Sequence, residues 1–362
     1  MRCGAFGDMV LLTALIRTLH AEFGLPVDIL TSGPWSAPLL AGQPGVGEIL
    51  TLRSRKTPYW LAPDQRLAVR RLRARGSGPT WFCDGGEAVR PLLARAGIGA
   101  EFIVDVKDHP LRPGEHATEQ WLRLAQIMPA VMPAAMPARA TGMLRASAAF
   151  TAGCQLEVGD RQRAELDAWL AARGIVAPLI AVQMGNKRTM RRGLRRLAVN
   201  SKYWPMERWV EVLRHLRAAC PAHAIVLLGT GPEYALNRDT AASAAIERLY
   251  NVADDLPVPR LVALLERAAG LVTVDSGPAH AGAAVGCPQV VLFGKALPSL
   301  YRPWGTRGGD VKVLTGRLDG DASMLGIAAR DVQNAWDALE LRPQRSALSM
   351  SGVTSTTPPL VT

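Results

Sequence analysis

Short apolar runs rich in β-branched residues alternate with amphipathic segments along most of the chain. Apolar runs of four to eight residues predict buried strands, and apolar spacings of three and four predict helices. Strands alternating with helices are typical of doubly wound α/β folds with parallel sheets. The strands predicted in this way lie at 27–30, 46–52, 80–83, 102–106, 179–183, 224–228, 271–274 and 288–293.

A stretch rich in Ala, Met and Pro interrupts this alternation near the middle of the chain. Pro129, Pro133 and Pro137 recur there, so the stretch cannot be one continuous helix. A chain of 362 residues is also long for a single core, which favours two domains. We expect a first domain over 1–157, a second over 158–327, a helix over 328–342 and a disordered tail over 343–362.

One strand, turn and helix unit carries the strongest chemical signal. The apolar run 271–274 ends in Asp275-Ser276-Gly277, and a helix of small residues follows. Asp275 or Ser276 can cap this helix, and its first N–H groups form a site for phosphate or another anion. His280, in the first turn, would reach the bound group. The alternative is an ordinary capped crossover with a structural histidine.

Four other glycine turns or polar positions adjoin predicted strands or helices. Gly7 and Asp8 feed a helix start, Gly185 follows the strand at 179–183, and Glu233 follows the strand at 224–228. Lys202 ends a basic insert over 187–202 and precedes Tyr-Trp-Pro. Each polar residue also has a structural interpretation: a cap for Asp8, a solvated loop for Lys202 and an acid in a first helical turn for Glu233.

The charge balance predicts an anionic partner. The formal net charge is +11, and the stretch 53–75 holds eight basic residues against one acid, Asp64. Such a stretch is either a solvated helix face or a surface for a phosphorylated lipid or an acidic membrane leaflet. Aromatic residues make up only 6% of the chain and no nucleic-acid motif is visible, so we expect no nucleic-acid partner.

Cysteine usage and hydropathy predict a reduced, cytoplasmic protein. The five cysteines are scattered without metal-ligand spacing, so we expect free thiols, no bound metal and no cofactor. No run approaches the ~18 apolar residues of a membrane helix. The first apolar run is bracketed by Asp8 and Arg17, which fits a signal peptide poorly. A peripheral contact at the cytoplasmic face of the inner membrane is a further expectation, from the basic stretch.

Three motifs together resemble glycosyltransferase family 9, the ADP-heptose:lipopolysaccharide heptosyltransferases. Asp275-Ser276-Gly277-Pro278-Ala279-His280, with the alanine-rich helix after it, is similar to the family's sugar-nucleotide signature. Gly7-Asp8 and Lys202-Tyr203-Trp204-Pro205 are similar to two further family motifs. The resemblance implies the GT-B arrangement, in which two Rossmann-like domains face a cleft and the final helix crosses back to the first domain.

The resemblance also implies a reaction. A heptose-type sugar would pass, with inversion, from ADP-heptose to an anionic lipopolysaccharide-core or related glycan acceptor. Asp8 would be the general base, and Lys202 would neutralise the donor pyrophosphate. Glu233 would meet the ribose hydroxyls. The remaining donor residues would be Gly185, Asp275, Ser276, Gly277 and His280, and the acceptor-side residues would be Gly7, Arg55, Lys56 and His116.

One departure from the family pattern leaves other functions open. Family members carry a complete hydrophobic strand before the Gly7-Asp8 loop, whereas here only Met1 and Arg2 precede Cys3. We therefore expect a truncated first strand, arising from a misplaced start or a shortened chain. The alternatives to transfer are a GT-B sugar-nucleotide epimerase and a non-catalytic protein that binds sugar nucleotides or anionic lipids.

Overall fold

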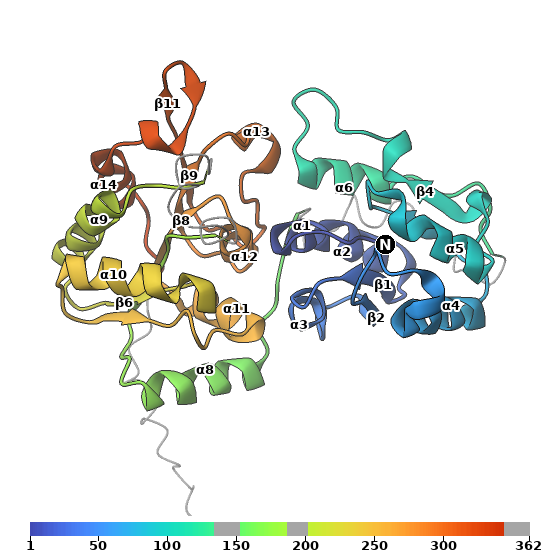
Figure 1. The fold of residues 1–362 in the computed structure, drawn as a ribbon, viewed down its shortest axis with the longest axis horizontal. Coiled ribbons are helices and arrows are strands. Elements are labelled where there is room, and N and C mark those ends of the chain that lie inside the picture. The colour runs from blue at the N-terminus through green and yellow to red at the C-terminus, as the bar shows by residue number, and fades with distance from the viewer. Residues whose placement is uncertain (134–152, 187–201, 344–362) are drawn as a thin grey trace, which may run out of the picture.

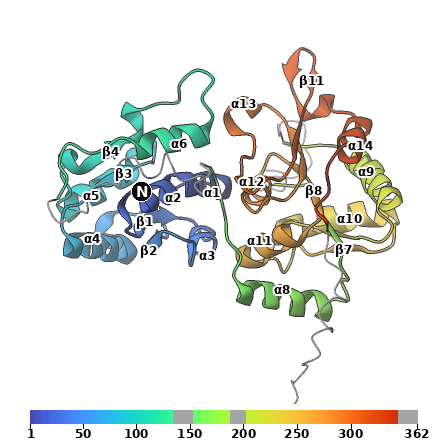
Figure 2. The ribbon, with the colours of Figure 1, turned by 180° about the vertical axis from the view of Figure 1, so that it is seen from behind.

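The computed structural model describes residues 1–133, 153–186 and 202–343, which form two α/β halves. Figures 1 and 2 show the halves side by side, with a single extended strip of chain running between them. The basic insert up to residue 201 and the tail from 344 lie outside the described residues. No helix in the described ranges is long and apolar enough to cross a membrane.

The second half is built on six parallel strands. Their order across the sheet is β10-β9-β8-β5-β6-β7, so the strand order reverses beside β5 and β8. The strands are β5 (Leu179–Gln183), β6 (Ala224–Leu227), β7 (Leu249–Asn251), β8 (Gly270–Val274), β9 (Gln289–Phe293) and β10 (Val311–Thr315). The helices around them are α8 (Asp160–Ala172), α9 (Met206–Ala219), α10 (Tyr234–Ala244), α11 (Val258–Arg267), α12 (Gly277–Ala284), α13 (Pro298–Tyr301) and α14 (Ala329–Asp337).

Helices cover both faces of this sheet because successive side chains of each strand point to opposite sides. Ala181 and Leu271 pack in one apolar cluster with α8, α11 and α12. Val182 and Val272 pack in a second cluster with α9 and α14. The central strands are therefore buried on both faces, which explains their unbroken apolar runs.

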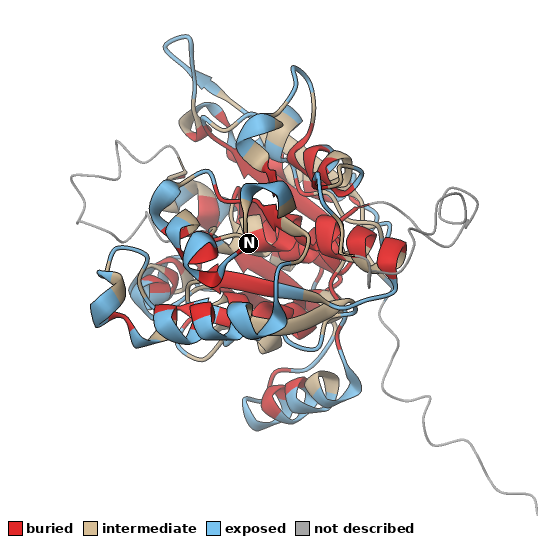
Figure 3. Cartoon of the chain, turned by 90° about the vertical axis from the view of Figure 1, so that its right-hand side faces the viewer, coloured by how far each residue is buried: buried red, intermediate tan, exposed pale blue. Residues whose placement is uncertain are grey.

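The first half is a smaller sheet with a short central segment. Its strands are β1 (Val27–Ser32), β2 (Val46–Leu52), β3 (Thr80–Phe82) and β4 (Ile103–Asp105), paired in parallel as β1 with β2 and β3 with β4. Its helices are α1 (Phe6–Leu11), α2 (Thr13–Phe23), α3 (Ser36–Leu40), α4 (Pro63–Arg75), α5 (Arg90–Ala96) and α6 (Ala117–Ala125). Figure 3 looks at this half, with buried strands behind exposed outer helix faces.

Residues 1–3 join the two strand pairs. Arg2 N donates to Leu30 O on one side at 3.1 Å, and Met1 O accepts from Cys83 N on the other at 2.8 Å. The order across the sheet is thus β2, β1, residues 1–3, β3 and β4. Beside Met1, between β1 and β3, lies a mainly apolar cavity of about 360 Å³. The expected first strand is therefore present only as this short extended segment.

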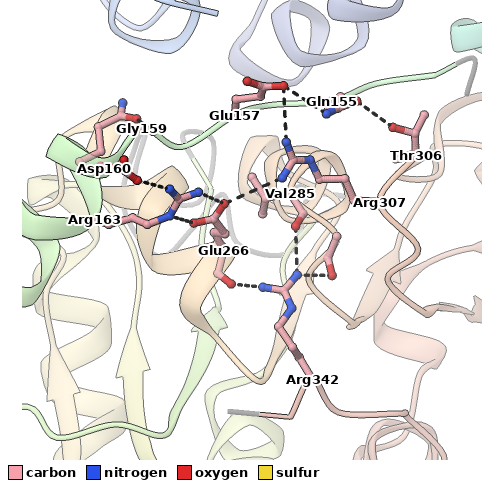
Figure 4. Close-up of polar contacts among 12 residues, drawn as sticks. Gln155, Glu157, Gly159, Asp160, Arg163, Glu266, Val285, Thr306, Arg307 and Arg342 are labelled. Carbon is pink, nitrogen blue, oxygen red and sulfur yellow. Dashed lines mark hydrogen bonds and ion pairs between the residues drawn. The ribbon is translucent and has the colours of Figure 1, made fainter. Parts of the chain in front are cut away.

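Residues 153–159, which connect the two halves, contact both of them. From the second half, Thr306 donates to the Gln155 side chain, and Arg307 pairs with Glu157 at 3.7 Å (Figure 4). From the first half, Gln43 Oε1 accepts the Glu157 N–H at 2.8 Å. Apolar contact adds to this, because α1 and α2 share one buried cluster with α11 and α12. The halves are thus packed together as well as linked.

Every strand predicted from the apolar pattern is present, but one expected feature of the fold is wrong. The final helix, α14, packs on α9, β9 and β10 of the second half and does not cross to the first. Its buried Val332 and Trp336 belong to the second-half core. Four strands were missed. The strands β7 and β10 lie at the edges of the six-stranded sheet and are only half-buried. The strands β11 (Arg317–Leu318) and β12 (Asp321–Ala322) form a separate exposed antiparallel pair.

Candidate functional site

The turn between β8 and α12 forms an uncapped helix start. Ser276 takes the N-cap position, but no side chain caps the helix. Its hydroxyl lies 3.2 Å from that of Thr273 instead. The expectation that Asp275 or Ser276 caps α12 is therefore wrong, since Asp275 has a different partner. An uncapped helix start presents its first N–H groups and the positive end of the helix dipole to a ligand.

Lys202 is fixed beside this turn. Its Nζ lies 2.7 Å from Asp275 Oδ2 and donates to the Asp275 carbonyl at 2.8 Å. The carboxylate is buried, whereas the ammonium side chain is 27% exposed. The cation is thus anchored at its inner side next to the start of α12. Together they offer positive charge at one place, the carboxyl edge of the central strands.

Glu233 lies at the neighbouring strand end and is fully engaged with the protein. Its Oε1 accepts from Gln183 Nε2 at 3.0 Å, and its Oε2 accepts from Thr230 N at 3.0 Å and Thr230 Oγ1 at 2.8 Å. Burial raises the pKa of this carboxyl. A Cβ at Gly185 would come within 2.5 Å of Oε1, so the bare backbone of Gly185 allows the carboxylate to approach.

Asp8 comes from the other half, in the first turn of α1. Its Oδ2 accepts the Ala5 N–H at 2.7 Å, and its Oδ1 lies 3.5 Å from a guanidinium nitrogen of Arg2. The carboxylate remains 37% exposed. Asp8 therefore has the structural role of closing the helix start, and its exposed side is accessible to a reactant as well.

The first turns of α1 and α12 meet where the halves join. A Cβ at Gly7 would lie 2.7 Å from Cδ2 of His280, and a Cβ at Gly277 would overlap the ring of Phe6. Figures 1 and 2 show the two helix starts adjacent. Glycine at both positions permits this close approach. Two helix starts, each carrying partial positive charge, are thereby brought together.

His280 is buried between these groups. Burial lowers its pKa to about 4, and the charges of Asp275, Lys202 and Asp8 all act on it. The imidazole is therefore neutral at neutral pH. Its Nδ1 is buried and has no hydrogen-bond partner within the described ranges. A neutral ring can either donate to or accept from a ligand, depending on its tautomer.

His116 is a contact between the halves. Its Nδ1 accepts from Thr118 N at 3.1 Å and its Nε2 lies 2.9 Å from Arg302 O, so Nε2 carries the proton. Its ring also lies 5.0 Å from the ring of Trp304. Both nitrogens are thus held by the protein, and burial lowers the His116 pKa. Acceptor contact by His116 stays a prediction.

Arg55 and Lys56 follow β2 at the same edge of the first sheet. Arg55 lies 3.6 Å from the buried carboxylate of Asp84, which accepts the Cys3 N–H at 3.2 Å. Lys56 is exposed. The loop carrying both cations is therefore attached to the segment that leads into Asp8.

Comparisons with known proteins found a family match within the second half. Residues 195–316 match the family described as Glycosyltransferase family 9 (heptosyltransferase). Among curated proteins, lipopolysaccharide heptosyltransferase 2 of Escherichia coli (strain K12) is 25% identical over 156 residues, 40% of this chain and 44% of that protein. Lipopolysaccharide heptosyltransferase 3 of Escherichia coli is 30% identical over 125 residues, 32% of this chain and 37% of that protein. The chain is thus similar to glycosyltransferase family 9 over part of its length.

Two solved structures share the fold of this protein over almost the whole chain. The E. coli ADP-heptose lipopolysaccharide heptosyltransferase II structure has a TM-score of 0.66 at 19% identity, covering 93% of this chain and 96% of that one. A family 9 glycosyltransferase from Veillonella parvula has a TM-score of 0.72 at 16% identity, covering 93% and 95%. The fold is GT-B. In sequence, by contrast, the chain spans less than half the length of the curated relatives.

The family match covers only one side of the candidate site. Residues 195–316 include Lys202, Glu233 and the turn from Asp275 to His280, but not Asp8. The sequence prediction missed Arg2, Gln183 and Thr230, which hold the carboxylates of Asp8 and Glu233. The Thr-x-x-Glu spacing of Thr230 and Glu233 is a capping-box pattern that could have marked Thr230. No local pattern marks Arg2 or Gln183, since Arg2 acts through a side-chain rotamer and Gln183 contacts a residue 50 positions away. Within the described ranges, no cluster of three His, Cys, Asp or Glu could hold a metal ion.

Proposed function

We propose that this chain is a member of glycosyltransferase family 9 and an inverting enzyme. It would move a heptose-type sugar from a nucleotide diphosphate, ADP-heptose by the family resemblance, to an anionic lipopolysaccharide-core or related acceptor. The observation that carries the proposal is the meeting of the α1 and α12 starts, with Asp8 on one side and Lys202 on the other. The named relatives are heptosyltransferases, which supports the sugar class.

The donor half would stabilise the leaving group. When the bond between sugar and nucleotide breaks, negative charge grows on the diphosphate. The N–H groups at the start of α12 and the Lys202 ammonium lie where they would bind that charge, and preorganised groups of this kind lower the barrier. Asp275 holds Lys202 in place. Glu233 and Gly185, at the next strand end, would meet the nucleoside.

The acceptor half would supply the base. Asp8 has an exposed carboxylate beside the start of α12, so it would accept the proton of the acceptor hydroxyl as that oxygen attacks the anomeric carbon. Its contacts with Ala5 N–H and Arg2 orient the carboxylate. Gly7, Arg55 and Lys56, with His116 at the junction, would line the acceptor side.

One observation favours a second function. The Asp8 carboxylate accepts the Ala5 N–H at the start of α1 and pairs with Arg2, so a structural role alone accounts for its position. A non-catalytic binder of sugar nucleotides would keep the donor half and make no use of Asp8.

A transfer assay separates the two functions. Purified chain, ADP-heptose and heptose-deficient lipopolysaccharide core should yield ADP and an acceptor heavier by one heptose, detected by mass spectrometry. UDP- and GDP-sugars should give less product. A folded chain that binds ADP but never transfers sugar would overturn the enzyme proposal and leave the binding protein.

A further inference from the structure

Large apolar side chains are exposed together on the first half. Trp60, Leu61 and Leu67 are 72%, 55% and 45% exposed and lie within eight residues, at the 3₁₀ turn Tyr59–Leu61 and the start of α4. Trp60 is the most exposed large apolar side chain in the described residues. Single exposed apolar side chains are common, but a tryptophan and two leucines in one short segment suggest a binding surface.

Basic side chains surround these apolar ones. Lys56, Arg66 and Arg70 are all exposed, and Arg66 donates to the Trp60 carbonyl, which holds its guanidinium beside the tryptophan. The buried face of α4 is formed by Gln65, Ala68 and Val69. Its outer face near the 3₁₀ turn therefore carries Arg66, Leu67 and Arg70.

The positive charge is concentrated at this end of α4. At the other end, Arg75 lies 2.8 Å from the carboxylate of Asp28, and Arg71 lies 3.8 Å from that of Glu48. Those carboxylates offset the cations of the last turns. Beside Trp60, one acid, Asp64, stands against Lys56, Arg66 and Arg70, so this end of α4 has a net positive charge.

The surface also adjoins the acceptor side of the candidate site. The 3₁₀ turn follows β2, so it lies at the carboxyl edge of the first sheet, where the Asp8 loop begins. Arg55, in the same connection, contacts Asp84, which holds Cys3. A partner bound here would lie next to the entrance used by an acceptor.

We propose that this surface docks the chain on an anionic lipid bilayer. We name it the Trp60 surface and define it as Lys56, Trp60, Leu61, Arg66, Leu67 and Arg70. Tryptophan and leucine enter the headgroup region, while the cations pair with lipid phosphates. A nucleic-acid backbone would contact the cations alone and leave Trp60, Leu61 and Leu67 exposed to water. The proposal goes beyond sugar transfer and does not depend on it.

Vesicle flotation without any donor tests the proposal. The full chain should float with vesicles of about one-third phosphatidylglycerol and much less with pure phosphatidylcholine, and salt should weaken binding. Trp60→Ser with Leu61→Ser should lower the partition coefficient about tenfold or more, because both side chains lose apolar burial. Arg66→Gln with Arg70→Gln should lower it about fivefold per arginine and flatten the salt dependence.

Matched substitutions elsewhere provide the controls. Val176→Ser with Leu318→Ser removes apolar side chains that are 64% and 45% exposed. Arg161→Gln with Arg238→Gln removes cations whose side chains are 90% and 65% exposed. Both control pairs should bind vesicles like the wild type. The proposal is overturned if the wild type does not discriminate between the vesicles, or if the Trp60 and Leu61 substitutions leave binding unchanged. Vesicle binding by a chain that transfers no sugar would still support it.

Discussion

The second half (the proposed donor half) and the first half (the proposed acceptor half) hold their candidate site residues in different ways. In the donor half, Lys202, Glu233 and Asp275 surround the ends of buried parallel strands, and Glu233 and Asp275 are themselves buried. Their partners come from neighbouring strand ends. Moving any of these groups would disturb a core that is closed on both faces of the sheet.

The acceptor half holds Asp8 with fewer contacts, all from its own loop. The Asp8 side chain is 37% exposed and is oriented by Arg2 and the Ala5 N–H, and residues 1–3 of the same loop join β1 to β3. An apolar cavity lies beside that segment. We therefore expect donor binding to survive substitutions in the acceptor half that abolish transfer, because the donor-side residues are held by contacts within their own half.

The largest expected effect comes from a substitution that impairs only the acceptor half. Asp8→Asn keeps the shape of the side chain and removes its basicity, so transfer should fall by about 10²- to 10⁴-fold, while ADP affinity changes little. Asp28→Asn is the matched control, since Asp28 is also 37% exposed and paired with an arginine. Transfer kinetics and calorimetry on both variants would measure this. If Asp8→Asn and Asp28→Asn transferred sugar at the same rate, Asp8 would not be the general base.

A second substitution tests the junction between the halves. Gly7→Ala places a methyl group 2.7 Å from the His280 ring. Alanine favours a helix by up to ~1 kcal/mol, but overpacking against a buried ring costs about 1–3 kcal/mol, so we expect net destabilisation and slower transfer. Gly85→Ala is the control, because its Cβ would meet no atom within 4 Å. Urea unfolding of Gly7→Ala and Gly85→Ala gives the midpoint of each variant. Equal midpoints would show that Gly7 and the His280 ring are not in close contact in solution.

A further expected effect concerns pH. Burial lowers the His280 pKa to about 4, whereas an unfolded histidine titrates near ~6.5. The unfolded chain therefore binds the proton first as the pH falls, so the His280 contribution to stability is lost between about pH 6.5 and pH 4. Between pH 7 and pH 5, protonation of His280 in the unfolded chain should lower the free energy of unfolding by about 2 kcal/mol.

The variant His280→Asn tests this contribution. It should lose less stability than the wild type between pH 7 and pH 5, measured by urea unfolding at each pH. The same acid sensitivity in both proteins would mean that His280 is not buried as a neutral ring.

The donor half was largely predictable from sequence because its signals are local. The turn at Asp275 follows an apolar run directly, and its helix start needs only the order of neighbouring residues. The contact of Lys202 with Asp275 joins positions 73 residues apart. The family resemblance assigned both residues to the donor site, but the ion pair between them was not predicted.

The rest of the site could not be read from spacing. Arg2 meets Asp8 through a rotamer, and His116 meets Arg302 across 186 residues of chain. The final helix was placed wrongly because the resemblance alone assigned it to the first domain, whereas its Val332 and Trp336 pack in the second-half core. Edge strands β7 and β10 were missed because half-buried strands lack the continuous apolar run that marks a central one.

The most direct test of the account is calorimetric titration of ADP into the wild type and into Lys202→Gln. Lys312→Gln serves as the control, since Lys312 also pairs with an aspartate, Asp310, at 3.0 Å. Losing the Lys202 cation also leaves Asp275 facing the phosphates, so ADP affinity should fall about 10- to 100-fold. Lys312→Gln should bind like the wild type. Unchanged ADP affinity in a folded Lys202→Gln protein would contradict the assignment of the donor site.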